Sequence, residues 1–340
     1  MSLIMREPGL YTSIQDLGRQ KFQHIGIVKN GSIDQLNHRL ANMLVGNDED
    51  EALLEMTFKM PSIQFTEPTL IAITGAHFPA YRDDKKILPY KIHLMNKGEV
   101  LSFEDAHKGT RVYLAIAGGI VADEWLGSKS TSIRLGMGGH KGRLLQQGDE
   151  IELFRNYSPL QKKLFANLEE TKTADWGIDQ YTLALNYFTD IFHIISGEGM
   201  SHFKQDEIKN LENRVYKVSN RFNRTGLTLE GESIVNREIN DQSFLSVKKG
   251  TVLLNEENQL VIMLNDHQSL SSYPQLGTIA SYHIDKLAQK KQGSKIIFRT
   301  LSIEEAEKNM KKHAQFVKQI KTGIKYKLQE EMQKQSKHKM

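Results

Sequence analysis

Residues 8–55 read PGLYTSIQDLGRQKFQHIGIVKNGSIDQLNHRLANMLVGNDEDEALLE and join a polar loop to one well-marked helix. Ser32 is predicted to cap the start of this helix, because Gln35 three residues later completes a capping box. Four apolar residues recur at helical spacing and share one face: Leu36, Leu40, Met43 and Leu44. Gly46 stands where a helix commonly ends. The pattern predicts a short amphipathic helix whose N-terminus points back at the loop.

The loop itself carries three polar side chains of different kinds. Gln15 is an amide, Asp16 is an acid and Arg19 is a permanent cation. Together they suit a ligand that bears a carboxylate, an amide or a phosphate group. The alternative is a structural loop, in which Asp16 and Arg19 pair with each other or with the backbone.

Composition limits the class of protein. The chain has 340 residues, enough for two domains, and its 39% hydrophobic and 25% charged content is typical of a soluble globular protein. No apolar run approaches the roughly 18 residues of a membrane span, and no basic-then-apolar start suggests export. The chain contains no cysteine, which excludes thiolate nucleophiles and cysteine zinc sites and fits a reducing cytoplasm.

The positive charge is confined to one end of the chain. Residues 308–340 hold ten lysines and two glutamates, so this segment carries +8 while the chain as a whole carries +4. The remaining residues therefore sum to −4. A nucleic-acid-binding domain would carry its charge on a folded face, so we expect no nucleic-acid partner.

The first half has the pattern of a mostly β domain. Short apolar or alternating runs punctuated by glycine and proline occupy residues 62–75, 92–103, 110–121 and 148–154. Between the first two runs, a charged turn at Asp83 and Asp84 separates two further short strands.

A helical segment follows, and then the strand pattern returns. Ser158 and Pro159 are typical of a helix start, and LQKKLFANLEE continues the helix. Further β-type runs occupy residues 191–197, 214–220, 226–235, 251–256 and 260–264. Strands at this spacing favour closed barrels or sandwiches. We predict a first β-barrel-like half at residues 1–157, a helical connection at 158–179 and a second such half at 180–307.

The last segment, residues 308–340, is predicted to be a lysine-rich helical tail. Ser302 and Glu305 form a capping box, and apolar residues spaced by four follow, with Gly323 interrupting them. The simpler interpretation is a solvated amphipathic helix that frays into disorder. The alternative is a docking helix for an acidic partner or a membrane surface.

Two more polar clusters could carry chemistry in the first half and at the start of the second. Residues 125–145 gather hydroxyls and cations among glycines, namely Ser128, Lys129, Ser130, Thr131, Arg134, His140, Lys141 and Arg143. Such a loop could bind an anion, although a structural turn explains it equally well. Residues 219–231 bring Asn223 and Arg224 together before a strand, where they could bind a carboxylate or form an Asx-capped turn.

A last cluster lies in residues 265–277, after an apolar strand. Asp266, His267, Gln268 and Tyr273 are its candidates, and His267 is the best titratable group among them. No second histidine or carboxylate stands at ligand spacing, so the sequence supports no metal site.

In this order, the clusters resemble the biotin-dependent carboxyltransferase family, which includes allophanate hydrolase subunit 2, the C-type component of 5-oxoprolinase and the antagonist of the sporulation-kinase inhibitor. Eight motifs carry the resemblance: PGLYTSIQDLGR, GSIDQLNHRLANMLVGN, LIAITGA, RVYLAIAGGI, LGSKST, GGHKGRLLQQGD, FNRTGLTLEG and NDHQSLSSYP. It runs from about residue 6 to about residue 308. It implies a mainly β fold of two cyclophilin-like β-barrel subdomains, A and B, with a few helices and the C-terminal helical tail.

The resemblance also implies a function and a partner. A B-type subunit, similar to allophanate hydrolase subunit 1, would supply the rest of the assembly. With it, the chain would use ATP to activate a small amide or lactam, most simply 5-oxoproline, as a hydrolase subunit. The alternatives are carboxyl transfer to urea from carboxybiotin held on a separate carrier, and a non-catalytic antagonist of a kinase-inhibitor protein.

The resemblance assigns roles to particular residues. Asp16, Asp34 and Arg19 would be catalytic, whereas Gln15, Ser130, Thr131, Arg143, Asn223, Arg224, Gln268 and Tyr273 would bind substrate. From the residues themselves, we expect the QDLGR loop, the GSKST loop and the NRTG turn to converge, so that Arg19, Arg143 and Arg224 form an anion clamp.

Some positions depart from the family pattern. Lys129 replaces an arginine, and Ser269 to Pro274 read SLSSYP where the family has Thr-Thr-Gly-Gly-Tyr-Pro. Serine tolerates a glycine backbone conformation poorly. The departure favours a diverged substrate or the antagonist alternative.

Overall fold

The chain forms two compact units in a computed structural model, which describes all residues except 106, 181–182, 184–186, 198–202, 204, 233–243 and 335–340. Unit 1 comprises residues 1–19, 30–185 and 317–340, and unit 2 comprises residues 20–29 and 186–316. The end of the strand expected at 226–235 and the last residues of the tail therefore lie outside the described part.

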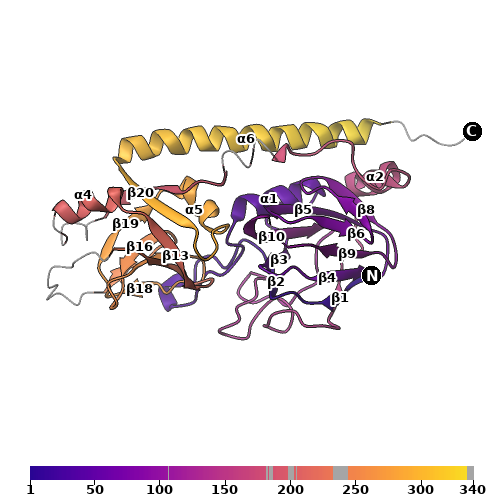
Figure 1. The fold of residues 1–340 in the computed structure, drawn as a ribbon. Helices are drawn as coiled ribbons and strands as arrows, with labels where there is room; N and C mark the ends of the chain where they lie inside the picture. Colours follow the sequence, from indigo (N-terminus) through magenta and orange to yellow (C-terminus); the bar gives the residue numbers. More distant parts are fainter. Residues whose placement is uncertain are drawn as a thin grey trace, which may run out of the picture. The chain divides into compact units, whose positions relative to one another are not determined.

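Unit 1 is built from two antiparallel sheets (Figure 1). The first has the order β11 (Glu150–Glu152), β1 (Ser2–Glu7), β4 (Ser62–Phe65), β9 (Val100–Phe103), β6 (Ala80–Arg82), β7 (Lys85–Ile87). The second has the order β2 (Tyr11–Gln15), β3 (Leu53–Thr57), β10 (Lys108–Ile116), β5 (Thr69–His77), β8 (Ile92–Met95). One apolar core takes residues from both sheets, among them Leu3 and Phe65 from the first and Leu54 and Val112 from the second. Burial alternates along β4 of the first sheet, whereas β3 and most of β10 in the second sheet are buried on both faces.

Helix α1 (Gln35–Leu44) covers the second sheet against β5 and β10 (Figure 1). The predicted cap was wrong by two residues. Asp34 is the N-cap, and its carboxylate accepts a hydrogen bond from the backbone N–H of Asn37 at 3.0 Å. Ser32 is held elsewhere, because its own N–H donates to the carbonyl of Asp16 at 2.8 Å. Gly46 has a φ of 71°, the left-handed conformation expected after a helix end.

Helix α2 (Pro159–Leu168) begins with the predicted cap and lies in unit 1. Ser158 and Gln161 form a full capping box. The Gln161 side chain also donates to the side-chain oxygen of Asn47 at 2.8 Å and to the carbonyl of Val45 at 3.2 Å. These bonds tie the start of α2 to the end of α1.

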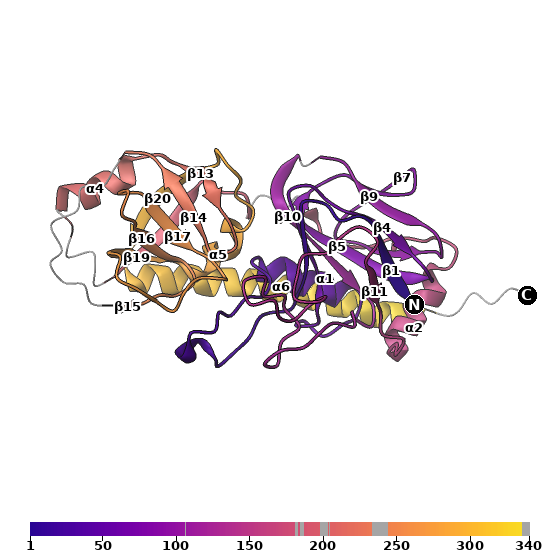
Figure 2. The same cartoon turned by 90° about the horizontal axis from the view of Figure 1, so that it is seen from below.

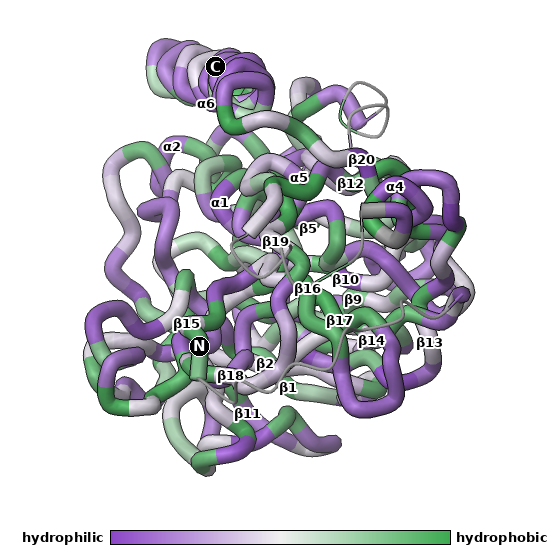
Figure 3. The backbone as a smooth tube through the Cα atoms, turned by 90° about the vertical axis from the view of Figure 1, so that its left-hand side faces the viewer, coloured by the Kyte–Doolittle hydropathy of each residue, from purple (hydrophilic) through white to green (hydrophobic). Residues whose placement is uncertain are grey.

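Unit 2 contains a closed barrel, seen from below in Figure 2. Its strands follow the order β12 (Ile191–Ser196), β19 (Gln275–Ile279), β16 (Thr251–Leu254), β17 (Leu260–Met263), β14 (Gly226–Glu230), β13 (Tyr216–Phe222), β20 (Lys295–Leu301). Among the described strands of the barrel, β12 and β20 alone pair in parallel, and this pair closes the barrel. The apolar runs at β16 and β17 are coloured as hydrophobic in Figure 3 and lie largely buried.

Smaller elements complete unit 2. They are the 3-10 helix η1 (Gln23–Ile25), helices α4 (Gln205–Asn213) and α5 (Ser281–Leu287), and the strand pair β15 (Leu245–Ser246) and β18 (Leu270–Ser271). η1 comes from the segment Gln20–Lys29, which belongs to unit 2 although it follows the QDLGR loop in sequence. The Ser269 hydroxyl donates to the carbonyl of Gln23 at 2.9 Å.

Helix α6 (Ile303–Gln333) begins at the predicted capping box of Ser302 and Glu305. The expectation of a solvated helix was wrong for its second half, which belongs to unit 1. Ile324 and Leu328 are buried there, at 3% and 8% exposure. Glu331 is also buried and accepts hydrogen bonds from Trp176 Nε1 at 2.9 Å and from the Asn167 side chain at 2.7 Å. Ile324 and Leu328 of the apolar series thus face the protein, whereas Met332 at its end is 45% exposed and lysines fill the other faces.

The mainly β architecture with few helices and a C-terminal helix confirms the predicted fold class. The charged turn is also present, because Asp83 connects β6 and β7 with a φ of 50°. Among the described helices, none is long and apolar enough to cross a membrane.

Candidate functional site

Asp16 organises the best-defined polar cluster of unit 1. Its carboxylate accepts hydrogen bonds from the hydroxyls of Ser128 at 2.7 Å and Ser130 at 2.5 Å. It also accepts from the backbone N–H groups of Gly18 and Lys129, each at 2.7 Å. Both carboxylate oxygens are therefore engaged, and the loop at 127–131 is bound to the end of β2. The sequence predicted that the QDLGR loop, the GSKST loop and the NRTG turn converge. The first two meet here, whereas the NRTG turn belongs to unit 2.

Gln15, on β2, bonds to the loop at 127–131 and to the segment before α1. Its amide nitrogen donates to the carbonyl of Thr131 at 3.3 Å, and its oxygen accepts from the N–H of Gly31 at 3.1 Å. Thr131 is itself anchored, because its hydroxyl donates to the carbonyl of Ile14 at 2.9 Å. Gln15 and Thr131 are almost fully buried, at 0% and 1% exposure. Their hydrogen bonds therefore join β2, the loop at 127–131 and the segment before α1 inside the protein.

Arg19 is buried at 1% exposure, which is unusual for an arginine. Its guanidinium donates to the Asn30 side chain at 2.8 Å and to the carbonyls of Trp125 at 3.1 Å and Ser130 at 2.5 Å. It also lies 4.8 Å from the centre of the Trp125 ring. Arg19 therefore fits the alternative in which it bonds to the backbone as part of a structural loop.

Asp34 and its neighbours form a second polar network between α1 and the sheet. Besides capping the helix, the Asp34 carboxylate accepts from the Asn37 side chain at 2.7 Å. The Tyr113 hydroxyl accepts from the N–H of Asp34 at 2.9 Å and donates to Glu55 at 3.0 Å. Burial, and then the nearby carboxylates of Glu55 and Asp34, raise the pKa of Tyr113 well above its usual value. The phenol therefore stays protonated and the network stays closed.

His38 is fixed in one tautomer. The Asn42 amide nitrogen can only donate, so Nε2 of His38 accepts from it at 3.2 Å. Nδ1 must then carry the proton and donate to the Ser32 hydroxyl at 2.8 Å. Burial lowers the pKa of His38 to about 3. His38 is thus a neutral residue that links Ser32 and Asn42 by hydrogen bonds, and not a base that could activate Ser32.

Two further cations of unit 1 are engaged with acids. Arg143 forms a two-pronged ion pair with Asp149 at 2.7 and 2.8 Å, and this pair holds the pKa of Asp149 far below its usual value. Lys129 bonds to Glu51 at 2.8 Å and lies 5.1 Å from the Phe154 ring. Arg143 remains partly open to solvent, with 30% side-chain exposure.

The predicted residues of unit 2 form a separate set of contacts. Arg224 is buried and pairs with Asp266 at 3.1 Å and 3.3 Å. The side-chain oxygen of Asn223 accepts from the N–H groups of Thr225 at 2.7 Å and Gly226 at 3.2 Å. This is the Asx turn that the sequence offered as an alternative.

The SLSSYP segment of unit 2 carries the remaining candidates. The Tyr273 hydroxyl donates to Glu256 at 3.0 Å, and Gln268 is exposed. Nδ1 of His267 donates to the carbonyl of Gln268 at 2.7 Å, and burial lowers the pKa of His267. His267 is therefore neutral and held locally.

The structure brings Gln15, Asp16, Arg19, Ser130 and Thr131 into one cluster, whereas Arg143 pairs with Asp149. Asn223, Arg224, Gln268 and Tyr273 belong to unit 2. The sequence analysis missed three buried polar residues, Glu55, Tyr113 and His38. The sequence could have indicated them only as polar residues that interrupt an otherwise apolar strand or helix face. Among the residues that the structure describes, no three His, Asp or Glu side chains are grouped to hold a metal ion.

Replacing Asp16 by asparagine is expected to destabilise unit 1. An asparagine keeps the shape, but its amide nitrogen cannot accept the hydrogen bond that Lys129 N–H donates to Oδ2. Loss of charge also weakens the bonds from the two serines, so we expect a loss of about 3 kcal/mol in the free energy of unfolding. Urea denaturation followed by circular dichroism measures it.

Asp123→Asn is the matched control for Asp16→Asn. Asp123 is exposed and accepts a single long bond from the N–H of Lys141 at 3.2 Å. Its replacement should change the free energy of unfolding by less than about 0.5 kcal/mol. Equal effects of the two substitutions would show that Asp16 does not organise the cluster.

Comparison with known proteins supports the resemblance. The family described as carboxyltransferase domain, subdomain A and B, matches residues 25–300. The chain is 29% identical over 314 residues to the C-type component of 5-oxoprolinase from Escherichia coli, across 92% of this chain and 95% of that protein. It is 41% identical over 147 residues to urea amidolyase of Lachancea kluyveri, across 43% of this chain and 8% of that protein.

A solved structure gives the same result. The Kluyveromyces lactis urea carboxylase matches with a TM-score of 0.78 and 25% identity, across 94% of this chain. This chain spans only 29% of the length of that structure. Because the family pattern covers most of the sequence and the fold agrees with it, this chain belongs to the carboxyltransferase domain family, subdomains A and B.

Proposed function

We propose that this chain is the C-type component of a 5-oxoprolinase and acts with a B-type carboxyltransferase subunit. The observation that carries the proposal is the length of the match to the E. coli C-type component, which covers 92% of this chain and 95% of that protein. A shared domain inside a larger enzyme would not align end to end in this way.

The burial of the candidate residues divides their roles within this proposal. Residues open to solvent can touch a substrate, and these are Asn223, Gln268, Arg143 and Tyr273. Six of the remaining candidates are buried, namely Gln15, Arg19, Asp34, Ser130, Thr131 and Arg224. Asp16 is half-buried, and both of its carboxylate oxygens are already hydrogen-bonded to the protein. We assign these seven residues to positioning: Asp16 holds the loop at 127–131, and Asp34 holds the start of α1.

ATP would supply the phosphoryl group that activates the lactam carbonyl. Phosphate binding needs cations and backbone N–H groups, since phosphoryl transfer is helped mainly by electrostatic stabilisation. The glycine-rich loop at 132–143 suits this role. Arg134 and Lys141 are exposed on it, and neither side chain has an ion-pair partner among the described residues. They are the residues of unit 1 best placed to hold the anionic end of the nucleotide.

The same loop also provides evidence for binding to a partner subunit. Residues 132–137 form a tight turn, in which the N–H of Ser132 donates to the carbonyl of Met137 at 2.8 Å. Three apolar side chains of this turn are exposed, Ile133 at 41%, Leu135 at 46% and Met137 at 38%. Apolar side chains gathered on a short exposed turn are typical of a protein interface.

Co-expression with the B-type protein tests the proposal. We expect the two chains to co-elute in size-exclusion chromatography, and Leu135→Asp to abolish co-elution. The control Leu88→Asp replaces an apolar residue of unit 1 that is 51% exposed on another loop, and it should leave the complex intact. The complex should hydrolyse ATP faster when 5-oxoproline is present, and the isolated chain should not. A complex without this stimulation would disprove the 5-oxoprolinase assignment.

Carboxyl transfer is the second candidate, and the 41% identity to urea amidolyase over 147 residues favours it. In that case carboxybiotin on a separate carrier would supply the carboxyl group. The same complex would then carboxylate urea and show no response to 5-oxoproline. A complex that is inert in both assays, yet binds a kinase-inhibitor protein, would support the antagonist alternative.

A further inference from the structure

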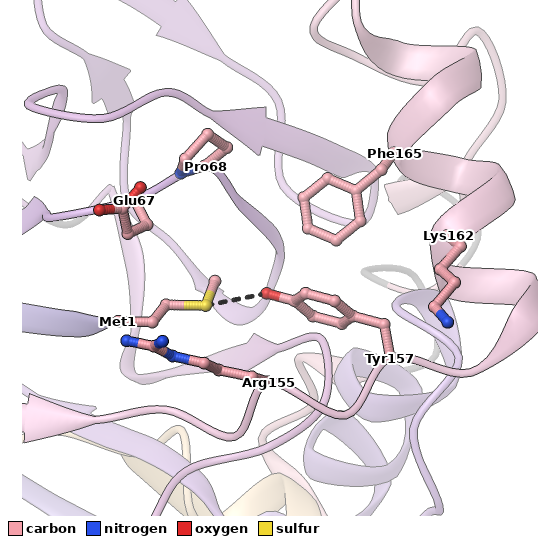
Figure 4. A pocket seen from close by; sticks show the side chains of 7 residues that line it. All are labelled: Met1, Glu67, Pro68, Arg155, Tyr157, Lys162 and Phe165. Atoms are coloured by element: carbon pink, nitrogen blue, oxygen red, sulfur yellow. Dashed lines mark hydrogen bonds between the residues drawn. The ribbon is translucent and has the colours of Figure 1, made fainter.

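Unit 1 contains a pocket of about 490 Å³ that none of the candidate site residues lines. It lies where the start of β1, the turn before β5, the segment after β11 and helix α2 meet (Figure 4). The lining residues are Met1, Glu67, Pro68, Arg155, Tyr157, Lys162 and Phe165. This volume falls within the range of about 300–1,000 Å³ that small-molecule sites commonly have.

Two aromatic rings form one wall of the pocket. Tyr157 and Phe165 pack edge to face, with ring centres 4.8 Å apart. Gly118 lies beside the Tyr157 ring, since a Cβ added to this glycine would come within 3.4 Å of it. Its hydroxyl contacts the sulfur of Met1 at 3.1 Å, as Figure 4 shows. The wall is therefore preorganised and apolar, and it suits a flat ring.

The charge around this wall is positive. Arg155 and Lys162 line the pocket, and neither has an acidic partner among the described residues. Glu67 is the single acid of the lining, and it pairs with Lys97 at 3.4 Å. Burial raises the pKa of Tyr157 to about 12, so its hydroxyl remains a neutral donor. An anion bound in this pocket would lie near the cations of Arg155 and Lys162 and the phenol of Tyr157.

We propose that this pocket binds a small molecule with a flat apolar ring and one anionic group, such as an aryl carboxylate. The ring would lie against Tyr157 and Phe165, and the carboxylate would take the paired N–H groups of Arg155. Lys162 would add charge from α2. This binding goes beyond the proposed function, because no residue proposed for 5-oxoproline or ATP lines the pocket.

Two probes that share the naphthalene ring, one anionic and one neutral, test the proposal. 1-Naphthoate and the neutral 1-naphthalenemethanol are titrated against the full chain by ligand-observed NMR. We expect naphthoate to bind at millimolar concentration or below, and at least tenfold more tightly than the alcohol. The double substitution Arg155→Gln and Lys162→Gln should weaken naphthoate about tenfold and leave the alcohol unchanged. Phe165→Leu should weaken both probes.

The matched control is Lys59→Gln with Lys85→Gln, which removes two exposed cations of unit 1 that do not line the pocket. It should bind both probes as the parent chain does. Thermal melting of every variant confirms that it is folded. No naphthoate binding, equal binding of the two probes, or equal loss in the two double variants would each overturn the proposal. ATP hydrolysis does not enter this test, so its outcome is separable from that of the proposed function.

Discussion

Replacing Ile324 and Leu328 by alanine is expected to lower the free energy of unfolding of unit 1 by about 5 kcal/mol. Both side chains are buried on the inner face of α6, at 3% and 8% exposure. Truncating a buried Leu or Ile commonly costs about 2–5 kcal/mol, because transfer free energy is lost and a cavity remains. For a unit of this size the melting temperature should fall by roughly 10 °C or more.

The control keeps the same helix and removes exposed lysines. Lys318→Ala with Lys325→Ala should shift the melting temperature little, since both side chains are exposed. Circular dichroism melting of the parent chain and the two double variants decides the matter. If the Ile324 and Leu328 substitutions lower the melting temperature no more than the two lysine substitutions do, the second half of α6 does not belong to the core of unit 1.

Acidification from pH 7 to pH 5 is expected to remove about 4 kcal/mol from the stability of unit 1. Burial lowers the pKa of His38 to about 3 and that of His93 to about 4. His93 is enclosed by hydrogen bonds with the carbonyl of Leu88 at 2.7 Å and the hydroxyl of Thr173 at 3.0 Å. Both imidazoles are therefore neutral in the folded chain.

The sign follows from proton uptake on unfolding. An unfolded histidine takes up a proton below a pKa of about 6.5, whereas these folded histidines do so only near 3 or 4. Between the folded and the unfolded pKa values, the unfolded state binds more protons than the folded state. The contribution of these neutral histidines to the free energy of unfolding is therefore fully present above pH 6.5 and decreases as the pH falls. Each histidine contributes about 1.4 kcal/mol per pH unit inside that window. His283 of unit 2, whose pKa burial lowers to about 3, should act in the same direction on its own unit.

Urea denaturation at pH 7, 6 and 5 measures this dependence. His93→Gln should reduce the loss between pH 7 and pH 5 by about 2 kcal/mol, because one of the two titrating groups is gone. His107→Gln is the control, since His107 is an exposed histidine of the same unit. An unchanged pH dependence in His93→Gln would contradict the assignment of a buried neutral imidazole.

The sequence alone determined the mainly β class and most of the elements. Its short apolar runs correspond to strands such as β5, β10, β16 and β17, because a run of this kind bounded by turn residues is a local property of one strand. The Ser158–Pro159 pair and the capping box at Ser302 also predicted helix starts correctly, since the bonds of a helix cap lie within one turn. The meeting of the QDLGR loop with the loop at 127–131 was expected from their shared polar and glycine content, but the role of the Asp16 carboxylate in joining them came only from the structure.

Only the tertiary structure decided which polar residues face solvent. Asp34 rather than Ser32 caps α1, because the carbonyl of Asp16 and the ring of His38 already engage Ser32. Arg19 looked like a ligand clamp, yet the Trp125 and Ser130 carbonyls, distant in sequence, enclose it. Local spacing carries no information about such partners.

The same limit applies to the two largest departures from expectation. The segment 20–29 belongs to unit 2, and the second half of α6 belongs to unit 1, although each follows residues of the other unit in sequence. The helical spacing of Ile324 and Leu328 predicted an apolar face, but it could not say what covers that face. Burial depends on contacts between segments far apart in the chain, and therefore only the folded structure could assign it.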